Sequence, residues 1–341
     1  MTNFKRLFLI LCLIAGAGQT RADETPAGVE LRDYTGWSAI YLNATEIPVQ
    51  AVIIPATGGR VAHFSLNGEN IFYENPATAG KTMGGTEENF WLGGYQCDVG
   101  PYTRRIPAHL RLTQEGGSWS AKRDFAASAN SAPDSVTGVE IDKSFVLAPD
   151  TGELGVMQTM RNISKTNVSY CLWDRTLCKG GGFVFFPLNE KSRFKAGWSQ
   201  LRRANGRDFY DGNKPDSLQA RVMDGVLVVQ ATGGVTQLGA DSTAGWIAYT
   251  LGKLLFVKYF PWRDGGNYSD GGNTVEVYFD QRAVELSPLS PEVNLAPGKE
   301  YGFPEKWVLL ALPKEAATWD EVRQLARKIP APPIWDAPSG K

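Results

Sequence analysis

Histidine is scarce in this chain of 341 residues, which contains only His63 and His109. No charge of either sign is in excess, because 35 lysines and arginines stand against 36 aspartates and glutamates. Proteins that bind nucleic acid or anionic membranes need a basic surface. The charge balance therefore argues against both of these partners and favours a neutral or mildly polar ligand.

Long apolar runs are also missing, apart from one at the N-terminus. Residues 7–17 form an apolar stretch behind Lys5 and Arg6, and it is too short to span a bilayer. Small residues at Thr20 and Ala22 follow it, in the pattern that a signal peptidase recognises. We predict a signal peptide over residues 1–22 and a secreted or periplasmic mature chain that is soluble. An uncleaved membrane anchor is the alternative.

Cysteine is rare too. Of the four cysteines, Cys12 lies in the leader, which leaves Cys97, Cys171 and Cys178. In an oxidising compartment two of these can pair, either Cys97 with Cys178 or Cys171 with Cys178, and one is left over. No histidine accompanies them at a zinc-site spacing, so we expect no metal and no cofactor. Residues 264–273, DGGNYSDGGN, match no known calcium-loop spacing and are interpreted as a polar hairpin turn.

Short strand-like runs separated by Gly, Asn, Asp and Pro fill the mature region. This pattern predicts an all-β fold, a large antiparallel β-sandwich. Residues 23–330 are predicted to form one domain, followed by a Pro-rich tail at 331–341, and residues 124–138 are predicted to be a loop. The predicted strands cover residues 47–54, 60–66, 143–147, 156–160, 168–177, 182–186, 226–230, 246–251 and 254–260.

One helix is predicted near the C-terminus. Thr318 and Glu321 have the spacing of a capping box. Val322, Leu325 and Ile329 then fall on one helical face, and a proline follows at position 330. We expect this helix to pack against the sandwich.

The segment from residue 273 to 312 is the most informative part of the sequence. It predicts a strand at 274–279, a tight turn at Asp280 and Gln281, a strand at 282–286, a Pro-rich loop, and a last strand at 307–312 that places Trp307 in the core. Glu285 ends the second strand just before the loop, where binding sites on β scaffolds tend to lie.

Several segments in this order resemble the galactose mutarotase-like superfamily, which includes the aldose 1-epimerases. They are residues 53–76, 93–101, 103–109, 161–164 and 169–188, together with the closing segment. Within the superfamily they are most similar to a secreted bacterial branch of the DUF4380 type. The resemblance implies an antiparallel supersandwich that holds a sugar in an open cleft floored by one sheet.

The resemblance also implies an acid–base pair. Mutarotases open the sugar ring with a glutamate as base and a histidine as acid, because one proton must leave while another arrives. Aligning the loop through Pro291 places Ser287 at the family glutamate, with Glu285 two residues earlier on the same strand face. Glu285 and His109 are therefore the candidate catalytic residues, whereas His63 is interpreted as a structural strand histidine.

Candidate ligand-binding residues lie beside Gly- and Asp-rich segments. Arg104 and Arg105 could hold a carboxylate or sugar hydroxyls, and Asp98 could accept from hydroxyls. Trp173 and Arg175 share a strand face with Cys171. Aromatic faces suited to stacking on a pyranose are supplied by Trp91, Tyr95, Trp262 and Tyr268.

The leading hypothesis is an exported carbohydrate-binding protein. An alternative is an aldose or hexose epimerase that uses Glu285 as base and His109 as acid. A further alternative is a polysaccharide lyase-like or glycan-processing enzyme, in which Arg104, His109 and Tyr268 would neutralise charge and transfer protons. Convergence of Glu285, His109 and Arg105 in one cleft would favour an enzyme.

Overall fold

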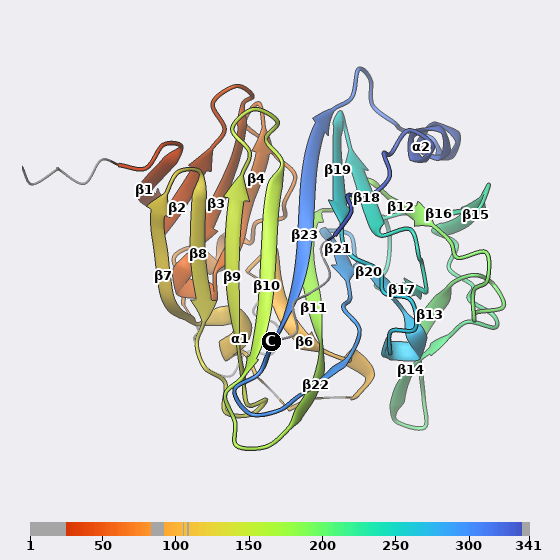
Figure 1. The fold of residues 1–341 in the computed structure, drawn as a ribbon. Coiled ribbons are helices and arrows are strands. Elements are labelled where there is room, and N and C mark those ends of the chain that lie inside the picture. The colour runs from red at the N-terminus through yellow and green to blue at the C-terminus, as the bar shows by residue number, and fades with distance from the viewer. Residues whose placement is uncertain (1–24, 83–91, 105, 108, 336–341) are drawn as a thin grey trace, which may run out of the picture.

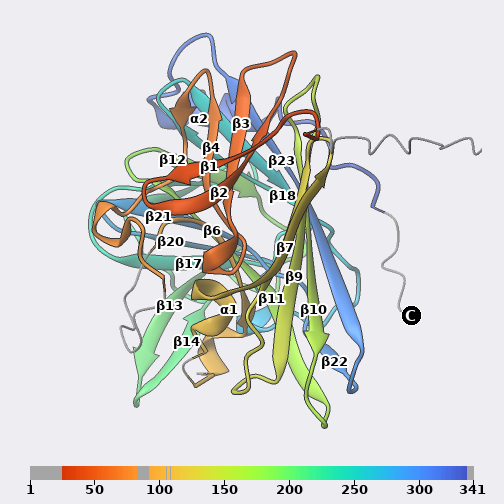
Figure 2. The same cartoon turned by 90° about the vertical axis from the view of Figure 1, so that its left-hand side faces the viewer.

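The computed structural model describes residues 25–82, 92–104, 106–107 and 109–335, and they form two packed antiparallel sheets (Figure 1). The turned view shows the two layers facing each other (Figure 2). Buried apolar side chains from both sheets form the core between them. The predicted signal peptide and residues 336–341 of the tail lie outside the described residues. The all-β sandwich with one C-terminal helix is confirmed.

The larger sheet has 13 strands among the described residues, in the spatial order β1-β2-β3-β4-β6-β11-β21-β20-β17-β13-β14, with β5 beside β4 and β22 beside β11. Their bounds are β1 (Val29–Tyr34), β2 (Trp37–Asn43), β3 (Val49–Ile54), β4 (Arg60–Leu66), β5 (Glu69–Asn70), β6 (Gly94–Gly100), β11 (Val168–Lys179), β13 (Ser199–Ala204), β14 (Arg207–Asp211), β17 (Thr236–Ala240), β20 (Val275–Phe279), β21 (Ala283–Pro288) and β22 (Val293–Leu295).

The second sheet has ten strands within the same described ranges, in the order β15-β16-β12-β18-β19-β23-β10-β9-β8-β7. Their bounds are β7 (Gly116–Arg123), β8 (Ala126–Ser131), β9 (Val139–Leu147), β10 (Leu154–Asn162), β12 (Phe183–Pro187), β15 (Ala220–Met223), β16 (Val226–Gln230), β18 (Trp246–Leu251), β19 (Leu254–Tyr259) and β23 (Glu300–Ala311). Two helices are α1 (Arg111–Gln114) and α2 (Trp319–Ala326).

Side chains alternate between the two faces of each strand, and the apolar side chains on the inward faces fill the space between the sheets. Trp307 on β23 is fully buried, as predicted, and aromatic rings from both sheets surround it. Its ring makes edge contacts with Tyr95 at 5.0 Å between centroids, with Phe256 at 5.8 Å and with Phe72 at 5.9 Å. Such edge-to-face pairs add to the stabilisation that burial of their apolar area provides.

A buried cluster of charges links the two sheets beside Trp307. The Lys258 ammonium on β19 lies 2.6 Å from an Asp174 carboxylate oxygen on β11 and 3.2 Å from a Glu305 oxygen on β23. Thr176 accepts a hydrogen bond from Lys258, and the Trp307 indole N–H donates to Glu305. Burial and the nearby Glu305 raise the pKa of Asp174 well above its usual range. One ammonium group thus contacts two carboxyl groups that are fully buried.

The sequence predicted most strands but not every connection. Residues 124–138 contain β8, because the small apolar side chains of Ala127 and Ala129 are buried on one face of that strand, so a loop throughout this region was wrong. Residues 264–273 are not a hairpin turn. They cross from β19 in one sheet to β20 in the other, since the two strands belong to different layers.

Two further local predictions can be compared with the structure. Helix α2 begins after the Thr318 N-cap with the predicted capping box, and Trp319 contacts Phe183 of β12 at 5.4 Å between ring centroids. Cys97, Cys171 and Cys178 are buried free thiols, so neither of the two pairings considered is formed. Among the described residues, no helix combines the length and the apolar character that crossing a membrane requires.

The buried charge cluster predicts a large effect on stability. Lys258→Met should lower the free energy of unfolding by about 3–5 kcal/mol, because it leaves two carboxyl groups buried without their cation. Lys306→Met is the matched control, since Lys306 pairs with the partly exposed Glu153 and should cost less than about 1 kcal/mol. Urea unfolding measures both. Equal losses in the two variants would contradict the role assigned to the cluster.

Candidate functional site

The outer face of the larger sheet, which points away from the inter-sheet core, carries a cluster of ionisable side chains. Arg175 on β11 is at its centre. Its Nε and Nη2 donate to the Glu285 carboxylate over 3.3 and 3.2 Å, and its Nη1 lies 3.7 Å from an Asp98 oxygen. Its guanidinium also covers the ring of Trp173 at 4.6 Å. One arginine therefore joins side chains from three adjacent strands.

Strand register explains why these residues meet. Asp98 on β6 lies opposite Trp173, and Gln96 lies opposite Arg175. Glu285 on β21 lies opposite Leu177 on the other side of β11. Because side chains two residues apart share a face, Trp173 and Arg175 point outward together, as the sequence predicted.

His109 approaches the cluster from the segment after β6. Its Nε2 lies 2.9 Å from an Asp98 oxygen, and its Nδ1 lies 2.6 Å from the Pro107 carbonyl oxygen. Burial lowers the pKa of His109, but the Asp98 hydrogen bond and charge outweigh burial and raise it to about 9. The ring is therefore a cation at neutral pH, and both of its N–H groups are donated within the protein.

Asp98 stays ionised for a related reason. Burial raises the pKa of Asp98, while the hydrogen bond from His109 and the charges of His109 and Arg175 lower it below the usual value. The Val99 backbone N–H also donates to this carboxylate over 2.8 Å. His109, Asp98, Arg175 and Glu285 thus form one continuous chain of alternating charges.

Aromatic side chains lie next to this row of charged residues. Tyr102 meets Trp173 edge-on at 5.8 Å, and 38% of Tyr102 is exposed. The Asp270 carboxylate fixes this segment by accepting from the backbone N–H groups of Tyr102 and Thr103 over 2.8 and 2.9 Å. The Trp173 indole N–H is buried and has no hydrogen-bond partner among the described residues. A ligand acceptor could satisfy it, because buried N–H groups are normally paired.

Glu276 on β20 is a site residue that the sequence interpretation missed. It lies opposite Ser287 on β21, whose hydroxyl donates to Glu285 over 3.1 Å. Burial, and secondarily the charge of Asp270, raise the pKa of Glu276 to about 8, although Asn273 donates to it over 3.1 Å. The carboxyl is therefore largely protonated at neutral pH. Its alternation with Val275 and Val277 was the only sequence signal that placed it on this face.

Other predicted ligand residues lie away from the cluster. Tyr95 points into the inter-sheet core against Trp307, because it has the opposite parity to Asp98 on β6. Arg104 pairs with Glu292 at 3.0 Å and donates to the Ser169 carbonyl over 2.6 Å. Its guanidinium is therefore engaged in joining segments of the protein.

The remaining predicted ligand residues that the structure describes do not belong to the Arg175 cluster either. Tyr268 accepts a hydrogen bond from the Arg263 backbone N–H over 3.0 Å, and Trp262 is 38% exposed in the same connection. Trp91 and Arg105 lie outside the described residues. Glu285 and His109 are thus joined through Asp98 and Arg175, whereas no contact among the described residues unites the Arg104, His109 and Tyr268 trio.

The cluster offers charged acceptors, guanidinium donors and aromatic surface within one area. Arg175 is its most accessible ionised member, with 28% of the side chain exposed, whereas the Glu285 side chain is 4% exposed. No group of three or more His, Cys, Asp or Glu residues within the described part of the chain is arranged to hold a metal ion. The arrangement is suited to binding a polar ligand and to proton transfer.

The His109–Asp98 pair predicts a measurable titration. The His63→Gln variant leaves one imidazole, whose NMR signals should titrate with a midpoint near pH 9 and not near the ordinary 6.5. Adding Asp98→Asn should move the midpoint back toward 6.5, because the anionic partner is gone. Since the pKa is raised on folding, the stabilisation from this pair is complete below about pH 6.5 and is lost as pH rises through about 9. A midpoint unchanged by Asp98→Asn would contradict the pairing.

Comparison with known proteins identifies the family to which the chain belongs. The model of the family described as "Domain of unknown function (DUF4380)" matches residues 117–310, which is more than half of the chain. No curated protein matches significantly. Similar solved structures include a TPR-domain containing protein from Parabacteroides distasonis ATCC 8503, with a TM-score of 0.59 and 12% identity. The match covers 89% of this chain but only 50% of that one.

Two further structures are matched over almost their whole length. A galactose mutarotase-like protein from Lactobacillus casei ATCC 334 has a TM-score of 0.54 and 13% identity, covering 80% of this chain and 100% of that chain. A protein from Synechocystis sp. PCC 6803 has a TM-score of 0.51 and 12% identity, covering 83% and 99%. At these identities the similarity shows the fold. The chain therefore adopts the galactose mutarotase-like fold and belongs to the DUF4380 family.

Proposed function

We propose that this protein is an exported carbohydrate-binding protein. It holds a saccharide on the outer face of the larger sheet, at the cluster around Arg175. The observation that carries the proposal is the bridge that Arg175 makes between Asp98 and Glu285 beside the Trp173 ring.

The chemistry of a sugar supports this assignment. Each hydroxyl both donates and accepts, so a saccharide site needs ionised acceptors and N–H donors close together. Asp98 and Glu285 supply the acceptors, and Arg175 and the unpaired Trp173 indole supply the donors. Tyr102 and Trp173 add aromatic surface for the C–H groups of a pyranose.

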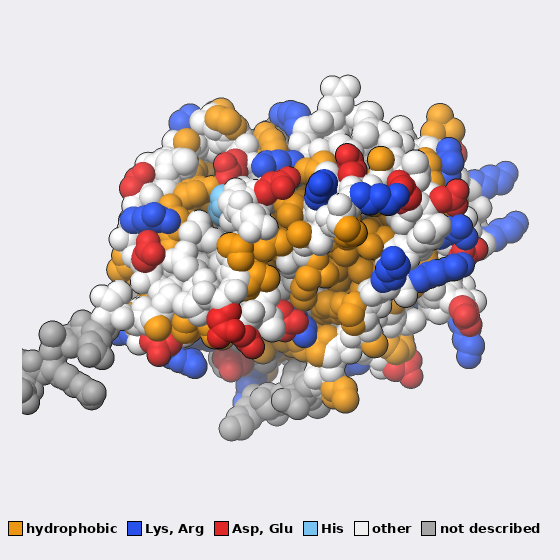
Figure 3. Space-filling model, turned by 90° about the horizontal axis from the view of Figure 1, so that it is seen from above, with side chains coloured by type: hydrophobic (Ala, Val, Ile, Leu, Met, Phe, Trp, Pro, Cys, Tyr) orange, Lys and Arg blue, Asp and Glu red, His pale blue; other side chains and the backbone are white. Residues whose placement is uncertain are grey.

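The charge balance of the chain agrees with an uncharged ligand, since 35 lysines and arginines stand against 36 aspartates and glutamates. On the end of the molecule that Figure 3 shows, acidic and basic side chains are interspersed and apolar side chains gather near the middle. The relative from Lactobacillus casei carries the description galactose mutarotase-like, which adds support for a sugar ligand. Export follows from the predicted signal peptide, with cleavage after Ala22, and belongs to the same proposal.

Isothermal titration against neutral and acidic mono- and oligosaccharides tests binding. Glu285→Gln should weaken the tightest interaction by about tenfold or more, because a hydrogen bond to a charged group contributes roughly 1.5–3 kcal/mol. Glu153→Gln is the control, since Glu153 pairs with Lys306 on the second sheet and should leave affinity unchanged. The absence of heat with every glycan, from a folded wild-type protein, would refute the proposal.

Mutarotation is a second candidate function, favoured by the two carboxyl groups on β20 and β21. Ring opening needs a base at the anomeric hydroxyl and an acid at the ring oxygen. Glu276 is largely protonated, while Glu285 is held by Arg175 on the same sheet face. In the structure His109 donates both of its N–H groups to protein acceptors, so this candidate assigns the role of the acid to Glu276.

Polarimetry of α-galactose and α-glucose tests this second candidate. An enzyme should exceed the spontaneous rate, and Glu285→Gln and Glu276→Gln should each reduce the rate constant by about 100-fold or more, the usual contribution of an acid or base. Glu153→Gln should keep the wild-type rate. A wild-type rate equal to the spontaneous one would end the catalytic interpretation and leave the binding proposal intact.

A further inference from the structure

A cavity of about 260 Å³ opens on the same outer face, near the edge formed by β1 to β4. Its lining includes Tyr34, Trp37, Arg60, Glu74 and Leu92. This volume is far more than one water molecule needs and is close to the lower range of small-ligand pockets.

Arg60 lines this cavity, and one nitrogen of its guanidinium has no hydrogen-bond partner in the part of the chain that the structure describes. Its Nη1 donates to the carbonyl oxygens of Leu92 and Gly93 over 2.7 and 3.0 Å, and its Nε donates to Thr57 over 3.4 Å. Its Nη2 is buried and has no hydrogen-bond partner among the described residues, although only 2% of Arg60 is exposed. The guanidinium also covers the Trp37 ring at 4.9 Å. A buried N–H group of this kind calls for an acceptor.

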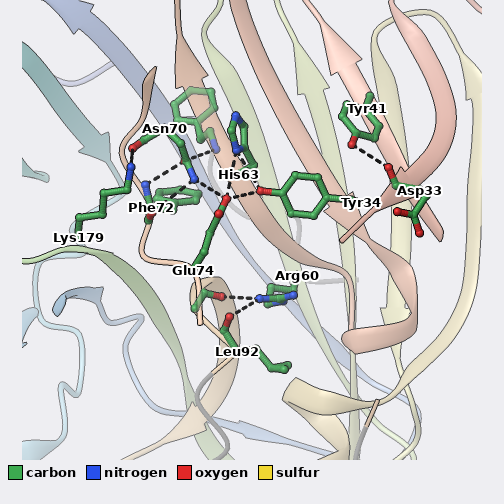
Figure 4. A network of polar contacts seen from close by, with 12 residues as sticks. Asp33, Tyr34, Tyr41, Arg60, His63, Asn70, Phe72, Glu74, Leu92 and Lys179 are labelled. Carbon is green, nitrogen blue, oxygen red and sulfur yellow. Dashed lines mark hydrogen bonds and ion pairs between the residues drawn. The ribbon is translucent and has the colours of Figure 1, made fainter. Parts of the chain in front are cut away.

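Glu74 supplies a fixed acceptor in the same cavity (Figure 4). Its Oε1 accepts from the Tyr34 hydroxyl and from the Asn70 amide over 2.7 Å, and it lies 3.3 Å from His63 Nδ1. Burial raises the pKa of Glu74, but the hydrogen bonds from His63 and Tyr34 outweigh burial and keep its pKa below the usual value. A cationic donor and an anionic acceptor thus line one cavity, together with aromatic surface. This combination fits a neutral ligand with hydroxyl groups.

The cavity lies on the sheet face that carries the Arg175 cluster. Trp37, Ala62 and Leu92 pack together as a group separate from the inter-sheet core, which places them on the outer face. Val61, next to Arg60, pairs with Tyr95, and Tyr95 pairs with Thr176, next to Arg175. The two sites are therefore two strand spacings apart, about 10 Å across the sheet. One sugar ring is too small to reach both.

We propose that the Tyr34–Trp37–Arg60–Glu74 cavity is a second saccharide subsite, so that the ligand is an oligosaccharide lying across β4, β6 and β11. This inference rests on the proposed carbohydrate binding at Arg175. The Arg60 Nη2 donates to a hydroxyl or ring oxygen of the second sugar unit, and the Glu74 carboxylate accepts from a neighbouring hydroxyl.

The test is the dependence of affinity on chain length. Isothermal titration with galactose, galactobiose, galactotriose and galactotetraose, and with the matching glucose series, should show at least a tenfold gain from one unit to three or four in one series. Arg60→Gln should abolish the gain while leaving the affinity for the monosaccharide unchanged. Ala79→Trp should do the same by blocking the cavity, and because Ala79 is exposed at the cavity wall this variant should fold even if Arg60→Gln does not.

The outcomes separate the two proposals. Monosaccharide binding without a gain from added units, or a gain that survives Ala79→Trp, overturns the second subsite alone. Glu285→Gln should weaken all members of the bound series alike, because it acts at the first site. A folded protein that binds no member of either series overturns the subsite, and silence across the wider glycan panel as well overturns the carbohydrate proposal itself.

Discussion

The alternation of side chains along β11 is the constraint on which both the core and the candidate site depend. Asp174 points inward to Lys258, and Arg175 points outward to Asp98 and Glu285. Each face of the strand therefore carries a charge that must be neutralised by residues from neighbouring strands. A slip of one residue would bury Arg175 among aromatic rings and expose Asp174 away from its cation, so the register of β11 is strongly specified.

This constraint gives the outer face its chemical character. Arg175 is flanked by two carboxylates, and His109 balances Asp98 from the far side, so the cluster has little net charge. The cavity at Arg60 and Glu74 repeats the combination of a guanidinium and a carboxylate next to an aromatic ring. Both areas offer donors and acceptors without a strong field of one sign. Such surfaces suit polyhydroxylated neutral ligands better than polyanions.

The sequence predicted the parts that local pattern controls. The two-residue spacing of Glu285 and Ser287 placed both on one face of the predicted strand, and the capping box at Thr318 located α2. Trp173 and Arg175 were predicted to share a face because β11 is long and regular. These features depend on neighbours close in the chain, so the sequence is sufficient to predict them.

Features that depend on distant partners could not be predicted in this way. Tyr95 was assigned to the ligand because it lies beside a Gly-rich segment, and GGYQCDVGP has no clear alternation that would have predicted its inward orientation. The protonation of Glu276 depends on burial beneath a connection that crosses between sheets. The pairing of His109 with Asp98 depends on how an irregular segment folds back over β6. Only the tertiary structure brings these groups together.

A crystal structure of the protein with the saccharide of highest affinity tests the central claim most directly. The account predicts a sugar ring beside Trp173, with its hydroxyls hydrogen-bonded to Arg175 and to Asp98 or Glu285. A sugar bound on the outer face of the second sheet, with the Arg175 cluster untouched, would contradict it.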